Sequence, residues 1–194
     1  MKSTYLILII YFVSFCPLMA IQSESYEFYS SQEKIDENST YSFLSEDGEL
    51  VWQAVYDTDI SIEDIKKNLI QKGVLIIESE TDNTITGTIK PFDVSYKKQG
   101  KSSMQIPLYV RDSSFTGFVL IEIKDNRYRV TIRDLKAVYS FTNGLVHKGD
   151  EFKLKDFAIS SKGILKKSFL KSAAPLLNYD FTNMFTTINL NEDW

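Results

Sequence analysis

Cysteine and histidine are almost absent from this sequence, because its 194 residues include one of each, Cys16 and His147. A structural zinc site needs about four such side chains, and a disulfide framework needs paired cysteines. The sequence therefore excludes a zinc centre, a Cys-His catalytic pair and a disulfide framework, and we expect neither a metal nor a cofactor. A serine with His147 and an acid could still form a triad, but no G-x-S-x-G sequence marks a nucleophile.

Positive charge is also scarce. The 22 lysines and arginines are outnumbered by 26 aspartates and glutamates, and the formal net charge is -4. Binding to nucleic acid depends on cations that neutralise phosphates, so we expect no nucleic-acid partner. Acids concentrate between Glu24 and Asp64 and lysines between Lys136 and Lys171, which we interpret as solvated faces of opposite sign.

The apolar stretch near the N-terminus is too short for a transmembrane helix, which needs about 20 residues. Lys2, the apolar segment Tyr5–Phe15 and the small residue Ala20 have the order of a secretory signal. Cys16 leaves a second interpretation open, a lipoprotein signal, although Phe15 stands where that motif has a small residue. Both alternatives predict an exported protein, periplasmic or extracellular, that meets a membrane only if it is lipidated at Cys16.

The sequence divides into four segments. Residues 21–48 are rich in Ser, Glu, Gln and Asn and show no sustained period, which is typical of a flexible leader. The predicted organisation is a signal peptide at 1–20, this leader at 21–48, a domain core at 49–138 and a C-terminal extension at 139–194 with a closing helix.

The core is expected to begin with a strand over Leu50–Tyr56, which is rich in Val, Trp and Tyr. A helix should follow over Ile62–Lys72, because its apolar residues share one face. Ser61 is the expected N-cap and Gly73 the left-handed stop. The chain should then continue through strands at Val74–Ser79 and Thr84–Lys90 and return through Met104–Val110.

The most regular pattern is a hairpin of Phe115–Lys124 and Arg127–Leu135 around the two-residue turn Asp125-Asn126. The turn sets the register, so that Glu122 should lie opposite Arg129. Side chains alternate between the two faces of a strand. The predicted apolar face holds Val119, Ile121, Ile123, Tyr128, Val130 and Ile132, and the predicted polar face holds Glu122, Lys124, Arg127, Arg129, Thr131 and Arg133.

The pattern weakens beyond Leu135. Ala137–Phe141 and Phe152–Ile159 are candidate strands, with Asn143-Gly144 as a turn. Near the end, Phe181, Met184, Phe185 and Ile188 are spaced for one face of a helix that Asp180 would cap.

The order of these elements, together with the run Ile121–Val130 and the following Asp134, resembles the bacterial domain of unknown function family numbered 4468. The resemblance covers Leu50–Val138. It implies an α+β fold in which an antiparallel sheet carries helices on one face, around a TBP-like core of order β-α-β4-α on an exported protein. Asn126 stands where members often have Gly, and residues from Ser140 onward match no motif of the family. The family has no established activity, so the resemblance implies no site.

The candidate site is the set of cations on the polar side of the hairpin: Lys124, Arg127, Arg129 and Arg133. We predict a non-enzymatic binding or structural domain of the cell envelope whose open sheet face or lysine-rich C-terminal part meets an anionic envelope component or a protein. The alternative is a hydrolase of envelope or dietary polymers that uses carboxylates and therefore needs a cleft lined by acids. Other signals are weak. Gly100-Lys101-Ser102 lacks the earlier Gly of a phosphate loop, and the acids from Asp57 to Asp64 are explained by helix capping.

Overall fold

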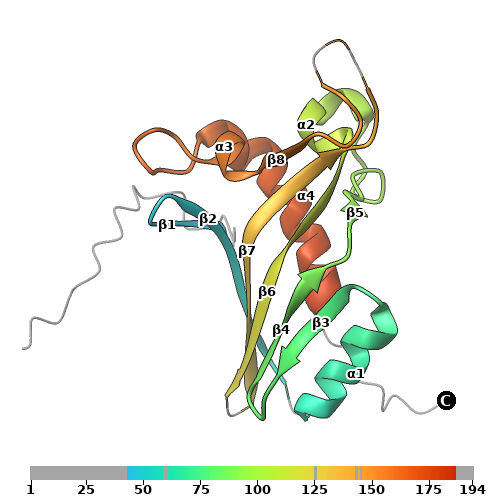
Figure 1. Ribbon diagram of the computed structural model, residues 1–194. Coiled ribbons are helices and arrows are strands. Elements are labelled where there is room, and N and C mark those ends of the chain that lie inside the picture. Colours follow the sequence, from blue (N-terminus) through green and yellow to red (C-terminus); the bar gives the residue numbers. More distant parts are fainter. Residues whose placement is uncertain (1–42, 59–60, 125, 143, 145, 187–194) are drawn as a thin grey trace, which may run out of the picture. The chain divides into compact units, whose positions relative to one another are not determined.

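The structure is a computed structural model that describes residues 43–58, 61–124, 126–142, 144 and 146–186, all within the compact unit Thr40–Trp194. It shows one antiparallel sheet with helices packed against it (Figure 1). No helix among the described residues is long and apolar enough to cross a membrane. The strands are β1 (Phe43–Glu46), β2 (Glu49–Asp57), β3 (Leu75–Glu80), β4 (Thr84–Ile89), β5 (Phe92–Asp93), β6 (Ser113–Lys124), β7 (Arg127–Tyr139) and β8 (Glu151–Lys153). The helices are α1 (Ile62–Lys72), the 3-10 turn η1 (Ser103–Gln105), α2 (Leu108–Arg111), α3 (Lys155–Ala158) and α4 (Lys167–Phe185).

The strand order is β1-β2-β7-β6-β4-β3, with β5 on β6 and β8 on β7. The long hairpin β6–β7 lies at the centre of the sheet, and its predicted register is confirmed, with Glu122 opposite Arg129 and Ile121 opposite Val130. The predicted α+β class with an antiparallel sheet is also confirmed.

A bulge interrupts this hairpin at Gly117, where the register shifts between Thr116 and Phe118. On the facing strand, Asp134 adopts a positive φ of 47°. A Cβ on Gly117 would lie 3.0 Å from the Leu135 side chain, so glycine suits the crowded site. The extra residue on β7 lets both Ile132 and Leu135 turn towards the core.

Helix α1 has the predicted bounds and caps. Ser61 has extended backbone and its Oγ accepts a hydrogen bond from the Asp64 N–H at 3.2 Å, while Gly73 ends the helix at φ 63°. Ile65 and Leu69 are buried in the main core. Local sequence is therefore sufficient to place this helix.

The apolar face of the sheet is covered by α4 (Figure 1). Phe181 is fully buried and its ring centroid lies 5.2 Å from that of Trp52. The Trp52 indole N–H donates to Asn178 Oδ1 at 2.9 Å, and the Ser95 backbone N–H donates to the buried Asp180 carboxylate at 2.8 Å. These contacts fix α4 on the first long strand, β2, and on the segment that follows β5.

The C-terminal end of α4 is held from two sides. The Lys72 ammonium, at the end of α1, donates to the carbonyls of Asn183 and Thr186, the first at 3.0 Å. The buried Tyr128 hydroxyl donates to the Phe185 carbonyl at 2.6 Å. A helix ends with unsatisfied carbonyls, and these donors satisfy several of them.

The predicted leader at 21–48 is wrong at its end, because Phe43–Glu46 form β1. A two-residue turn with positive φ at Asp47 (50°) and Gly48 (76°) joins β1 to β2, and Asp-Gly is a strong hairpin signal. The signal peptide at 1–20 and the rest of the leader lie outside the described residues.

The segment just before the hairpin and the region after it differ most from the predictions. Met104–Val110 is not extended but holds part of η1 and α2, and Phe152–Ile159 is divided between β8 and α3. Asp180 is not a cap, because α4 begins at Lys167 and contains Pro175. The predicted turn residues Asp125 and Asn143, and Ile188, lie outside the described part of the chain.

Candidate functional site

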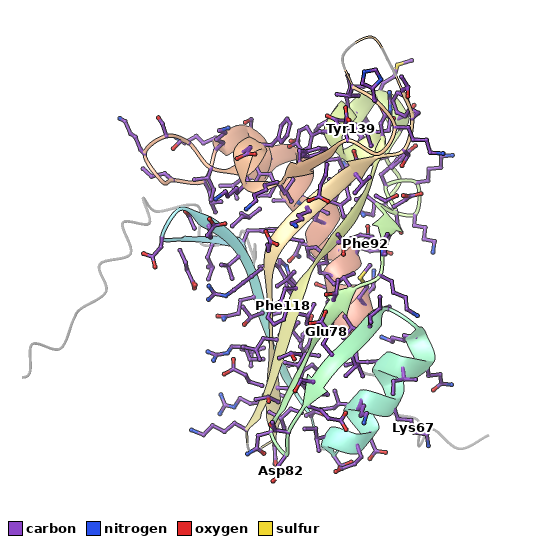
Figure 2. The ribbon with its side chains drawn as sticks, in the orientation of Figure 1. Lys67, Glu78, Asp82, Phe92, Phe118 and Tyr139 are labelled. Atoms are coloured by element: carbon purple, nitrogen blue, oxygen red, sulfur yellow. The ribbon has the colours of Figure 1, made fainter. Side chains whose placement is uncertain are left out.

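The face of the sheet opposite α4, which we call the open face, is uncovered by any described helix and carries exposed apolar side chains. Val55 is 56% exposed, Ile76 53% and Phe118 39%. The register places Ile76 beside Thr88, Thr88 beside Phe118, and Phe118 beside Arg133, so these residues form one row across four strands. Figure 2 labels Phe118. Large apolar side chains exposed along one surface mark a candidate interaction site.

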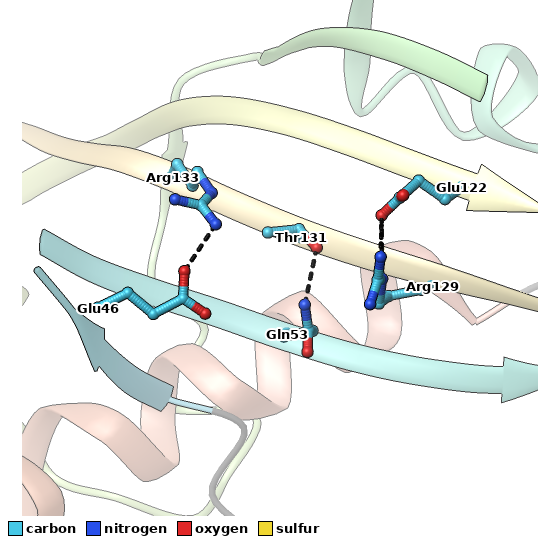
Figure 3. Close-up of polar contacts among 6 residues, drawn as sticks. All are labelled: Glu46, Gln53, Glu122, Arg129, Thr131 and Arg133. Atoms are coloured by element: carbon cyan, nitrogen blue, oxygen red, sulfur yellow. Dashed lines mark hydrogen bonds and ion pairs between the residues drawn. The ribbon is translucent and has the colours of Figure 1, made fainter. Parts of the chain in front are cut away.

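Charged and polar side chains on the open face are paired with one another (Figure 3). Arg129 donates from Nε and Nη2 to Glu122 Oε2 at 2.9 and 2.7 Å, as its predicted cross-strand position allows. Arg133 pairs with Glu46 at 2.7 Å. Between these two ion pairs, Gln53 donates to Thr131 Oγ1 at 3.1 Å. The pairs hold both guanidinium groups in place and neutralise them.

Arg127 and Lys124 have a different environment at the turn end of the hairpin. They lie opposite each other in the register, both are exposed, and neither forms an ion pair with a described residue. Asp57 is the neighbour of Arg127 on β2. The four predicted cations therefore separate into two neutralised arginines and two cations that are not neutralised within the described residues.

The sheet has no ligand-sized cavity in its described part. The best-formed pocket holds about 10 Å³ and lies beside the bulge, between Glu49, Asp134 and Lys153. Ligand sites typically measure about 300–1,000 Å³. Lys155 pairs with Glu49, and Lys136 lies 3.5 Å from Asp134, so the charges there are already balanced.

The carboxylate hydrolase predicted as the alternative needs acids with raised pKa values in a cleft. Burial raises the pKa of Asp180, but this carboxylate is on the buried side of α4 and accepts the Ser95 N–H. Burial likewise raises the pKa of Tyr56 to about 12, and desolvation lowers the pKa of Lys72. These groups hold the core and α4 together, and none of them lines the pocket beside the bulge.

The weaker sequence candidates have structural roles where they are described. Gly100 closes a turn at φ 71°, and Ser102 begins η1 with a capping box to Gln105, so this segment does not join a strand to a helix as a phosphate loop would. His147 is exposed, and its backbone N–H donates to Asp150 at 2.7 Å. No group of three or more His, Cys, Asp or Glu side chains among the described residues could hold a metal; Asp59 is outside them.

No family model and no curated protein matches the chain. Two solved structures are similar to it, and their descriptions name the TBP-like fold and the family that the sequence resembles. One is a TBP-like protein from Parabacteroides distasonis, with 14% identity, a TM-score of 0.46 and coverage of 72% of this chain and 92% of that one. The other is a DUF4468 family protein from Bacteroides ovatus, with 11% identity, a TM-score of 0.46 and coverage of 78% and 95%. Neither description names a ligand or an activity.

Proposed function

We propose that the chain is an exported domain of the bacterial envelope that binds a partner through its open face and catalyses no reaction. The observation that carries this proposal is the exposure of Val55, Ile76 and Phe118 on a sheet face that no described helix covers. Ile76 and Phe118 share one row of that face, and Val55 lies apart from them, beside Arg129. Exposed apolar side chains are what a binding surface needs at its centre.

The charges of the open face suggest how a partner is oriented. Arg129 and Arg133 are held by glutamates, so they contribute a fixed hydrogen-bonding pattern rather than net charge. Arg127 and Lys124 are exposed cations at one end of the face, where Asp57 lies opposite Arg127 on β2. An anionic envelope component, or a protein with acids beside an apolar strip, is complementary to this arrangement.

Export is supported by the N-terminal sequence, and the two forms of processing leave different products. Secretion leaves a chain that begins at Ile21, whereas lipoprotein processing leaves a lipid on Cys16. Intact-mass measurement of the protein from fractionated cells distinguishes these outcomes. A chain that keeps Met1 and stays in the cytoplasm would contradict the export part of the proposal.

The binding part is tested by capture of periplasmic proteins and glycans on the immobilised chain. The double variant Arg127→Ser/Lys124→Ser and the variant Phe118→Ser should both lose the captured partner. Lys67→Ser/Lys90→Ser removes the same charge from exposed positions elsewhere and should retain it. Equal loss in the control variant would show that general charge attraction, and not the open face, is responsible.

The absence of catalysis is tested separately with peptide, glycan and ester substrates. Among the described residues, the open face has neither a cleft nor a base held next to a nucleophile, so turnover should not exceed the background rate. Robust turnover that disappears in His147→Ala would identify the protein as an enzyme and overturn the proposal.

A further inference from the structure

A second exposed apolar cluster lies at the end of the sheet where β6 begins and β7 ends. Met104 is 96% exposed, Leu108 62% and Phe141 36%; we call these three residues the apolar tip. The Leu108 carbonyl accepts the Asp112 N–H at 3.0 Å, one helical turn later. The Asp112 carbonyl in turn accepts the Ser140 N–H at 2.9 Å. The tip therefore joins α2 to the segment after β7, which lie together in Figure 1.

The exposure of the tip is not needed to build the core. On α2, Val110 is buried, and Tyr109 packs inward with its ring 4.3 Å from Phe157. Leu108 faces solvent on the same short helix. Tyr109 thus packs on the inner side of α2, whereas Leu108 is exposed on the outer side and takes no part in that packing.

Three exposed lysines lie near the tip along the backbone. Lys101 lies just before η1, the 3-10 turn that contains Met104. The Lys101 N–H donates to the Tyr96 carbonyl, and Lys97 lies in the turn between these two residues. The Lys148 N–H donates to Thr142 Oγ1 at 2.9 Å, beside Phe141. Lys97, Lys101 and Lys148 form no ion pair with a described residue.

Of the acids near the tip, Asp93, Asp112 and Asp150, only Asp112 is neutralised by an ion pair, because Asp93 and Asp150 accept hydrogen bonds from neutral groups. Asp112 pairs with Arg111 at 2.6 Å, and Asp150 accepts the His147 N–H at 2.7 Å. The described acids around α1 are remote from the tip. They lie near Asp57, which is opposite Arg127, the first residue of the 13-residue strand β7. The tip lies at the other end of β7, after its last residue. That strand spans about 40 Å at 3.3 Å per residue. Salt screens charges over about 8 Å, so those acids do not cancel the field of the lysines.

We propose that the apolar tip and its lysines form a docking surface for an anionic lipid bilayer, separate from the open face. Exposed apolar side chains with exposed lysines nearby match a membrane interface, where apolar groups enter the acyl boundary and cations meet lipid headgroups. A protein partner fits less well, because three side chains offer only a few hundred Å², against about 800 Å² per partner in a standard interface.

Vesicle sedimentation tests the proposal with the processed chain purified from cells. The chain should bind phosphatidylcholine vesicles that contain about one third phosphatidylglycerol more strongly than pure phosphatidylcholine. Met104→Ser/Leu108→Ser should lower this binding about tenfold, and the exposed control Ile70→Ser should not. Lys97→Gln/Lys101→Gln should also lower it about tenfold, and the control Lys162→Gln/Lys167→Gln should not. Equal losses in tip and control variants would overturn the proposal.

A second measurement distinguishes the tip from attachment through a lipid on the N-terminus. Tryptophan fluorescence of Leu108→Trp should shift to shorter wavelength on the anionic vesicles and be quenched by brominated lipid. Ile70→Trp should show neither change, because α1 lies away from the tip (Figure 1). Attachment without a signal from Leu108→Trp, or docking that requires a protein on the vesicle, would overturn the proposal. Neither outcome bears on partner capture by the open face.

Discussion

Substitution of Phe181 by alanine tests whether α4 holds the sheet together. The Phe181 side chain is fully buried between the sheet and its own helix. Its ring centroid lies 5.2 Å from that of Trp52, 5.8 Å from Phe92 and 6.3 Å from Phe43. Phe181 therefore joins α4 to three strands, β1, β2 and β5.

The expected loss follows from these contacts. Truncation of a buried Phe to Ala lowers the free energy of unfolding by about 3–5 kcal/mol, which includes the cavity that remains. Three aromatic neighbours leave little room for the site to collapse, so we expect about 4 kcal/mol. A chain of this length should then lose about 8–16 °C in Tm. Tyr179 lies two residues away on the same helix but is 41% exposed, and Tyr179→Ala should change stability by at most about 0.5 kcal/mol.

Urea denaturation followed by circular dichroism measures both variants. The Phe181→Ala midpoint should fall with an unchanged m-value, because the folded and unfolded states keep their surface areas. A loss below about 1 kcal/mol, or an equal loss in Tyr179→Ala, would refute the packing of α4 described above.

Three further predictions concern single sites. Burial raises the pKa of Asp180, so the folded state binds its proton more tightly than the unfolded state, and stability falls as pH rises through the folded pKa. Asp180→Asn should therefore remove this pH dependence in urea titrations and be no less stable at neutral pH; a loss there would contradict the assignment. Gly87→Ala would place a Cβ 2.4 Å from the Ile76 carbonyl oxygen and should cost about 1–3 kcal/mol in thermal unfolding, whereas Gly144→Ala, which meets open space, should not. Lys72→Met should cost about 1 kcal/mol and speed hydrogen exchange in the last turn of α4, and unchanged exchange would exclude this cap.

The elements that local sequence predicts correctly are those whose signals lie within a few residues. Ser61 and Gly73 mark both ends of α1, and strict alternation around a two-residue turn fixes the register of β6 and β7. The Glu122–Arg129 pair follows from that register alone. The Glu46–Arg133 pair does not, because it depends on β1, whose pairing with β2 requires recognition of the Asp-Gly turn.

Helix α4 illustrates why the C-terminal part was harder to predict. Pro175 lies inside the helix and argues against helix on propensity. Ala173 and Ala174 are fully buried, yet alanine gives little periodic signal because it is common on both faces of helices. Packing against the sheet stabilises this helix, and such contacts arise between residues far apart in the sequence. The local pattern therefore predicts Asp180 as a cap, whereas the structure shows it as a buried acceptor.

The position of α4 as the last described helix has a consequence for how the chain folds as it is made. A ribosome delivers β2 more than a hundred residues before the helix that covers it. Until Phe185 emerges, Trp52 and its neighbours on the sheet have no partner to bury them, so the domain cannot reach its native state from a partial chain. Chains that stop before α4 should therefore leave Trp52 exposed to solvent, and its native packing should form only when Phe181 and Phe185 are present.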